Sequence, residues 1–116
     1  MKVKISNMTS MKRIEKPWGY EEILLEEENC LVKRLILKDE TSMHYHDFRN
    51  EVLIPVRGEG VIILDDNVLL LTCLKPVYVK SRVKHKIIPK DYLEVIEVAD
   101  VNIDDVVRVS DKHKRV

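Results

Sequence analysis

Two histidines and a glutamate within eight residues form the part of this sequence best suited to chemistry. His44 and His46 are separated by one residue, and Glu51 follows after a short polar segment. Side chains two residues apart on an extended strand project from the same face, so both imidazoles would point the same way. A turn after Asp47 would bring the Glu51 carboxylate back beside them. Imidazole and carboxylate groups together are ligands that suit first-row divalent metals.

A third histidine, His85, lies far along the chain in the segment Lys84-His85-Lys86. Three imidazoles and one carboxylate would leave coordination positions on a divalent metal for water. The sequence therefore predicts a metal site formed by four side chains: His44, His46, Glu51 and His85. Each histidine taken alone could instead be an ordinary surface or core residue. Zinc, manganese, iron and nickel all remain possible ions for such a site.

The same residues resemble the two motifs of the cupin superfamily. The run His-x-His-x4-Glu-x6-Gly, which ends at Gly58, is similar to the first motif, and residues 77–85 are similar to the second. Within the cupins, the chain most resembles the C-terminal domain of type II mannose-6-phosphate isomerases. This resemblance covers residues from about 13 to 109 and includes Pro17-Trp18-Gly19 together with the predicted metal ligands.

The resemblance implies a cupin barrel, a divalent metal in its cavity, and a carbohydrate or sugar phosphate as ligand. Arg49 matches the arginine that precedes the metal-binding glutamate in that family, which implies a catalytic role for it. Its planar guanidinium could hold a phosphate or carboxylate through two hydrogen bonds. An aldose–ketose isomerase needs a metal that polarises a carbonyl or hydroxyl, a base, and cations for the phosphate.

Several departures from that family keep other functions open. Ser42 stands where the family has glutamine, Val52-Leu53 where it has His-Trp, and Arg82 where the second motif has glycine. The metal ligands survive these changes, whereas the residues around a substrate differ. The alternatives to a metal-dependent isomerase are a non-catalytic cupin that binds a small sugar or anion, a metal-dependent oxygenase, and a protein that has lost its metal. A cavity filled by a side chain such as Phe48 would favour the non-catalytic alternative.

The segments around these residues have the pattern of short strands separated by turns. No stretch keeps helical periodicity over three turns, and Asp, Asn, Pro and Gly interrupt the apolar runs at short intervals. This pattern predicts an all-β protein, and a double-stranded β-helix would bring the predicted ligands together inside one cup. Strands are expected over residues 20–28, 30–38, 44–47, 51–57, 61–64, 68–73, 77–80, 83–88, 92–98 and 103–109.

Glycine and proline mark the expected connections between these strands. Residues 58–60 and 89–91 are expected to be turns, and residues 65–67 a hairpin loop. Pro55 cannot donate a hydrogen bond to a neighbouring strand, so a bulge or a sheet edge is expected there. Trp18 is expected to cap one end of the barrel.

Length and composition limit the domain organisation and the partners. The chain of 116 residues is expected to form a single domain (residues 1–116) with its own core. Its 20 lysines and arginines balance 20 aspartates and glutamates, so no net charge draws it toward nucleic acid or a membrane. No apolar run reaches the length of a membrane span, and the N-terminus lacks an apolar signal core, so a cytoplasmic location is expected.

The remaining features concern the cysteines, the chain ends and the oligomeric state. Cys30 and Cys73 fit no zinc spacing and are expected to be reduced and buried. Residues 1–12 are expected to form a loose arm or an edge strand, and residues 110–116 a solvated tail. A homodimer is expected from the resemblance, with the apolar segments 3–5 and 92–98 offering surfaces for pairing.

Overall fold

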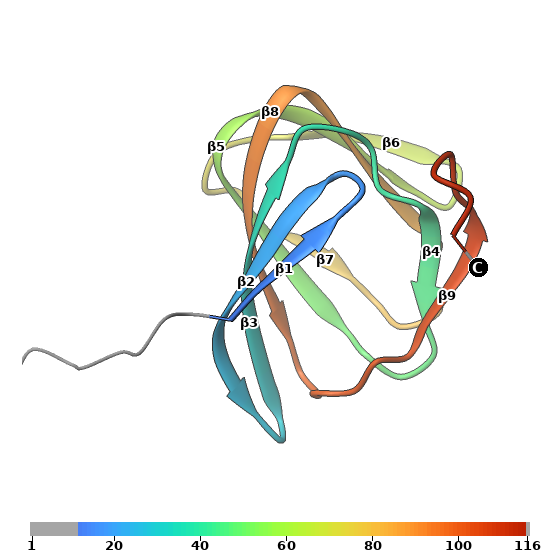
Figure 1. Ribbon diagram of the computed structural model, residues 1–116. Coiled ribbons are helices and arrows are strands. Elements are labelled where there is room, and N and C mark those ends of the chain that lie inside the picture. The colour runs from blue at the N-terminus through green and yellow to red at the C-terminus, as the bar shows by residue number, and fades with distance from the viewer. Residues whose placement is uncertain (1–11, 116) are drawn as a thin grey trace, which may run out of the picture.

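The computed structural model describes residues 12–115, which form nine strands and no helix (Figure 1). The strands curl into a barrel, and every strand pairing in it is antiparallel. The predicted all-β double-stranded β-helix is confirmed. The strands are β1 (Lys12–Lys16), β2 (Gly19–Glu27), β3 (Cys30–Leu37), β4 (Met43–His46), β5 (Glu51–Leu64), β6 (Asn67–Leu71), β7 (Val77–Val79), β8 (His85–Ala99) and β9 (Val106–Ser110). Within the described residues, no helix could cross a membrane.

Two long strands, β5 and β8, pair with each other along almost their whole lengths. The turns expected at residues 58–60 and 89–91 were wrong, because both segments lie inside these strands. Gly58 allows the paired strands to bend closely together: a Cβ atom there would lie 2.1 Å from the Tyr92 carbonyl oxygen. The pairing also shifts register directly after Pro55, so the bulge expected at this proline is confirmed.

Alternating side chains along these strands build the core. In β8, for example, Leu93 and Val95 are buried, while the residues between and beside them are only partly buried. Trp18, in the turn between β1 and β2, packs into the same cluster. The buried members of the cluster are Trp18, Leu35, Leu37, Leu53, Ile62, Leu71, Val79, Ile87, Leu93 and Val95.

The described chain differs from the sequence-based expectations at several other places. β1 was not expected, and most of the predicted N-terminal arm (residues 1–11) lies outside the described residues. Both cysteines are free, but the burial expected for them was wrong. Cys30 is only half-buried, and Cys73 is exposed in a turn because β6 ends before it. Residues 92–98 cannot offer a free edge to a second subunit, because β8 is paired with β3 on one side and β5 on the other.

The end of the described chain, where a solvated tail was expected, makes several specific contacts. The Arg115 Nε atom donates to the Asp111 Oδ2 atom over 2.7 Å, and the Asp111 side chain is almost fully buried. The Lys112 Nζ atom pairs with Asp39 at 2.6 Å. His113 places its Nε2 atom 3.3 Å from the Glu40 carbonyl oxygen.

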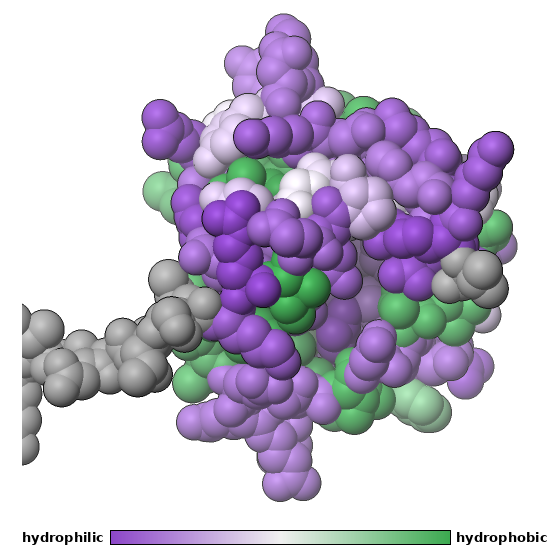
Figure 2. Space-filling model, viewed as in Figure 1, coloured by the Kyte–Doolittle hydropathy of each residue, from purple (hydrophilic) through white to green (hydrophobic). Residues whose placement is uncertain are grey.

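A cavity of about 370 Å³ lies inside the barrel, with its wall formed largely by β1, β2, β3, β4, β8 and β9. Figure 2 shows a recess in one face of the molecule, with hydrophobic and hydrophilic residues mixed around it. Phe48, the side chain considered as a plug, is 67% exposed and does not line the cavity. Phe48 therefore does not fill the cavity.

Arg82 has a φ angle of 67°, in the left-handed region that costs a residue with a Cβ atom about 1–2 kcal/mol. This is the position at which the second cupin motif has glycine. The Arg82 amide donates to the His46 carbonyl oxygen over 2.7 Å, so the backbone is held in this conformation. We expect Arg82→Gly to raise the free energy of unfolding by about 0.5–1 kcal/mol, since the relieved strain exceeds the added entropy of the unfolded chain.

Chemical denaturation would measure this change, with Arg82→Ala as the matched control. Alanine removes the same side chain but keeps the Cβ atom, so it should give no such gain. An equal gain from both variants would locate the strain in the arginine side chain and contradict the backbone explanation.

Candidate metal centre

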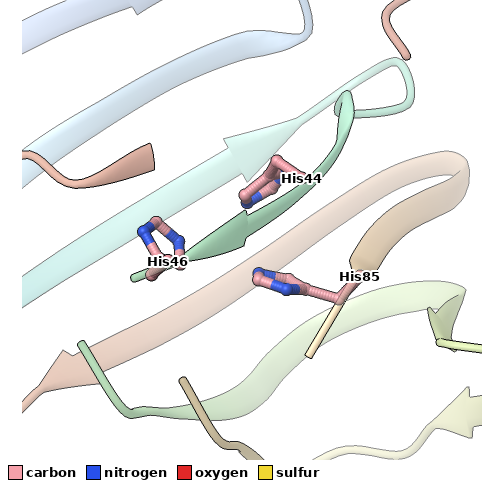
Figure 3. Close-up of side chains that lie close together, drawn as sticks. All are labelled: His44, His46 and His85. Carbon is pink, nitrogen blue, oxygen red and sulfur yellow. The ribbon is translucent and has the colours of Figure 1, made fainter. Parts of the chain in front are cut away.

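Three histidines from two strands meet at one end of the cavity. His44 and His46 lie on the same face of β4, as strand alternation predicts, and His85 begins β8 directly opposite His44. Figure 3 shows the three rings grouped between these strands. One ring nitrogen from each histidine lies within 4.8 Å of the others, which is close enough for all three to hold one metal ion.

Backbone carbonyls orient two of these rings. The Nδ1 atom of His44 lies 2.8 Å from the Ser42 carbonyl oxygen, and the Nδ1 atom of His85 lies 2.9 Å from the Val83 carbonyl oxygen. A carbonyl oxygen can only accept a hydrogen bond, so each Nδ1 atom carries the hydrogen. The Nε2 atom of each ring then keeps its lone pair, which is the form a metal ligand needs.

Asp105 orients the third ring. Its Oδ1 atom lies 3.1 Å from the His46 Nδ1 atom, while its Oδ2 atom accepts hydrogen bonds from the backbone amides of Phe48 and Arg49 over 2.8 and 2.9 Å. Burial alone would raise the pKa of Asp105, but the two amides and His46 outweigh it and lower the pKa. Asp105 is therefore an ionised acceptor that leaves the His46 Nε2 atom available.

Burial keeps the His44 ring uncharged. Desolvation, followed by the influence of neighbouring His85, lowers the pKa of His44 to about 3. The ring is accordingly neutral at physiological pH and able to donate its lone pair. The rings of His44 and His85 are also close, with their centroids 4.2 Å apart.

Glu51 lies beside the histidines as a buried carboxylate. Its Oε1 atom is 3.2 Å from the His46 Nε2 atom and 3.5 Å from the His85 Nε2 atom, yet neither carboxylate oxygen has a well-directed hydrogen bond. Burial would raise the pKa of Glu51, whereas hydrogen bonds from His46 and His85 would hold it well below its usual value. With the hydrogens of these rings on Nδ1, as described above, the facing Nε2 atoms cannot donate those hydrogen bonds, and a cation would have to take their place. A buried, ionised and poorly satisfied carboxylate is costly, so a cation between it and the rings would fit this donor set.

Arg49, which was expected to hold a phosphate or carboxylate of the substrate, contacts two of the predicted metal ligands. Its Nη2 atom is 3.2 Å from both the His46 Nε2 atom and the Glu51 Oε2 atom, and its Nη1 atom is 3.4 Å from the Ile103 carbonyl oxygen. The side chain is buried but also lines the cavity. Its guanidinium therefore borders both the predicted metal ligands and the cavity.

The cavity has more cationic than acidic side chains among the described residues, although the whole chain carries no net charge. Burial, followed by the charge of Glu51, also raises the pKa of Glu97 well above its usual value, which further reduces the negative charge of the wall. The cationic residues are Lys12, Lys16, Lys33, Arg49, Arg108 and Arg115, and the acidic residues are Glu21, Glu26, Glu97 and Asp104. Two of these cations, Arg49 and Arg115, are paired with Glu51 and Asp111, which do not line the cavity. The remaining excess of positive charge therefore depends on the raised pKa of Glu97, and it would suit an anionic ligand.

A family model described as the mannose-6-phosphate isomerase C-terminal domain matches residues 4–111. The chain belongs to this family. It is 34% identical over 126 aligned residues to a mannose-1-phosphate guanylyltransferase of Salmonella montevideo, covering 98% of this chain and 26% of the relative. The mannose-1-phosphate guanylyltransferase of Escherichia coli strain K12 is 28% identical over 112 residues, and this alignment covers 90% of this chain and 23% of that relative. The chain thus spans about a quarter of the length of these curated relatives.

Solved structures agree on the fold of this family member. A variant of Streptomyces PAC13 with uridine superposes with a TM-score of 0.81 at 12% identity, covering 96% of this chain and 93% of that one. KdgF from a Halomonas species superposes with a TM-score of 0.74 at 13% identity, covering 87% of this chain and 94% of that one. At such low identity, these similarities concern the barrel architecture alone.

Asp105 was missed in the sequence because it lies 59 residues from His46 and belongs to no spacing motif. We expect Asp105→Asn to weaken binding of a metal ion such as Zn²⁺ by about ten- to a hundredfold, which is typical when the partner of a liganding histidine is lost. An amide cannot accept from His46 and from both backbone amides, since one end of it is a donor.

Competition with a chelating dye would measure the zinc affinity of this variant. The control is Asp104→Asn, which removes the same charge from the exposed neighbouring residue and should leave the affinity nearly unchanged. Equal losses in the two variants would attribute the effect to overall charge, contrary to an orienting role for Asp105.

Proposed function

We propose that the protein is a metal-dependent sugar-phosphate isomerase whose metal is held by His44, His46, His85 and Glu51. The observation that supports this most directly is the buried Glu51 carboxylate, which faces two Nε2 atoms without a well-directed hydrogen bond. The cationic cavity and the membership of the mannose-6-phosphate isomerase C-terminal family support a phosphorylated sugar as ligand.

A divalent metal bound there would polarise a carbonyl or hydroxyl oxygen of the substrate and lower the pKa of bound water. The chain itself would supply the remaining functions. Glu51 contributes the negative charge that retains the cation, and Asp105 keeps the His46 ring in the liganding tautomer. Arg49 would bind the phosphate group through its planar fork after leaving His46. Glu97, on the cavity wall, would first have to lose its own proton; as a carboxylate it would then take the proton from one carbon and return it to the neighbouring carbon.

Elemental analysis of protein purified without chelator or affinity nickel tests the metal centre. We expect about one transition-metal ion per chain in the wild type and none in a His44→Ala/His46→Ala variant, because the latter retains too few donors. Glu51→Gln, which keeps the side-chain size and removes the charge, should lower the affinity for added Zn²⁺ at least about tenfold. A wild-type protein that takes up no metal even after reloading would reject the centre.

Activity is the second part of this test. Metal-loaded wild-type protein should interconvert mannose 6-phosphate and fructose 6-phosphate, and chelator should abolish turnover. Full metal occupancy without turnover of these or other sugar phosphates would reject the isomerase while leaving the metal centre intact.

A second candidate is a metal-free pocket that binds an anionic sugar. The position of Arg49 favours it, because the Nη2 atom already supplies a cation between His46 and Glu51. In that case, chelator-treated protein should bind mannose 6-phosphate as tightly as untreated protein, and Arg49→Met should lose the binding. Dependence of the binding on added metal would exclude this candidate.

The homodimer expected from the sequence remains a proposal. The strand that supports it is β6, not the one expected. Among the described strands β6 pairs with β5 alone, and its residues Val68, Leu69 and Leu70 are exposed. An apolar strand with one free edge is suited to pairing with a second copy. Gel filtration with light scattering would settle the mass, and a monomer would reject the proposal.

A further inference from the structure

A second group of charged side chains lies on the cavity wall, on strands that carry no histidine of the metal centre. Glu21 on β2 and Lys33 on β3 both line the cavity. Figure 1 shows these strands across the barrel from β4 and β9. Leu31 and Leu35, which have the same orientation as Lys33 along β3, are buried apolar residues. A lysine on this face is therefore an exception that core packing does not explain.

The two side chains form a buried ion pair. The Lys33 Nζ atom lies 3.2 Å from the Glu21 Oε1 atom, and the two side chains are only 13% and 9% exposed. Lys33 also lies directly opposite Glu97 in the pairing of β3 with β8, and Lys16 places its Nζ atom 4.0 Å from the Glu21 Oε1 atom. The desolvation of such a pair offsets much of its attraction, so apolar residues would serve stability as well. The pair is better explained by a polar ligand in the cavity.

We propose that Glu21 and Lys33 recognise hydroxyl groups of the ligand on the part of the cavity wall formed by β2 and β3. A carboxylate accepts hydrogen bonds and an ammonium group donates them, and each hydroxyl can do both. The pair can therefore bind two neighbouring hydroxyls while its members remain close to each other. A phosphate group is a poorer partner here, because Glu21 repels it.

This inference rests on the proposed sugar-phosphate ligand and adds residues that select among its hydroxyls. The carbons that react must lie at the metal, so the hydroxyls recognised by Glu21 and Lys33 are those on carbons that take no part in the isomerisation. A sugar that lacks these hydroxyls would then be bound poorly, because Glu21 and Lys33 would lose water without gaining a partner.

Isothermal titration calorimetry on the metal-loaded protein tests the proposal with three probes: D-mannose 6-phosphate, D-mannose and inorganic phosphate. The double variant Glu21→Leu/Lys33→Met replaces the ion pair with apolar side chains of similar size. We expect it to bind both sugars at least tenfold more weakly and inorganic phosphate as well as the wild type does. Its metal content should be unchanged and its melting temperature should not fall.

The chain offers a matched control on the outer face of the same two strands. Arg34 pairs there with Glu22, one residue along from the proposed subsite on each strand. Glu22→Leu/Arg34→Met should leave the binding of all three probes unchanged. The single substitution Glu21→Gln keeps the packing and should weaken sugar binding in the same direction, which guards against misfolding of the double variant.

The outcomes separate this proposal from the proposed function. Sugar binding by the double variant that equals that of the wild type overturns the subsite and leaves the isomerase untouched. Wild-type protein that binds mannose 6-phosphate no better than inorganic phosphate also overturns the subsite, because the hydroxyls then contribute nothing. Loss of sugar binding in the variants, together with a wild type that has no turnover, supports the subsite and rejects the isomerase. No binding of any probe by the wild type overturns both.

Discussion

The candidate metal centre depends on one constraint: the paired strands β5 and β8 must curl until the two ends of the pair meet. In the pairing register, Glu51 lies opposite Ala99 at one end and His85 lies opposite Leu64 at the other. On a flat ribbon these ends would be separated by roughly 40 Å, at about 3.3 Å per residue. In the structure, the Glu51 Oε1 atom is 3.5 Å from the His85 Nε2 atom. The paired strands must therefore curl through most of a turn, and the candidate metal centre lies where the curl closes.

The bends that allow this closure come from a few residues with unusual backbone requirements. The pairing shifts register after Pro55 and again between Gly58 and Gly60, which adds local twist at these positions. A Cβ atom at Gly60 would lie 2.7 Å from the Ile88 carbonyl oxygen, so the two backbones approach closely there as well. These bends serve the site indirectly, because without them the carboxylate and the third histidine would not meet.

The sequence was informative where side-chain type alone carries the chemistry. His44 and His46 share a face because strand alternation requires it, and His85 and Glu51 were added to them through the resemblance to the two cupin motifs. The continuous strands β5 and β8 were missed for the opposite reason. Glycine and proline usually end strands, and only the long-range pairing of two whole segments reveals that here they bend them. Asp105 could not be predicted either, since its role depends on a contact across the fold.

Strand β4 has little backbone pairing with β8, so a metal ion bound at the centre would also affect the stability of the fold. This strand pairs with β9 along its whole length, but with β8 only through His44 opposite His85. Much of the remaining connection passes through the Arg82 amide, the Asp105 carboxylate and the histidines themselves. A cation shared by His46, His85 and Glu51 would therefore join β4, β5 and β8 at the point where backbone pairing is weakest. Because such a cation binds only the closed arrangement, part of its binding free energy would stabilise the closed barrel.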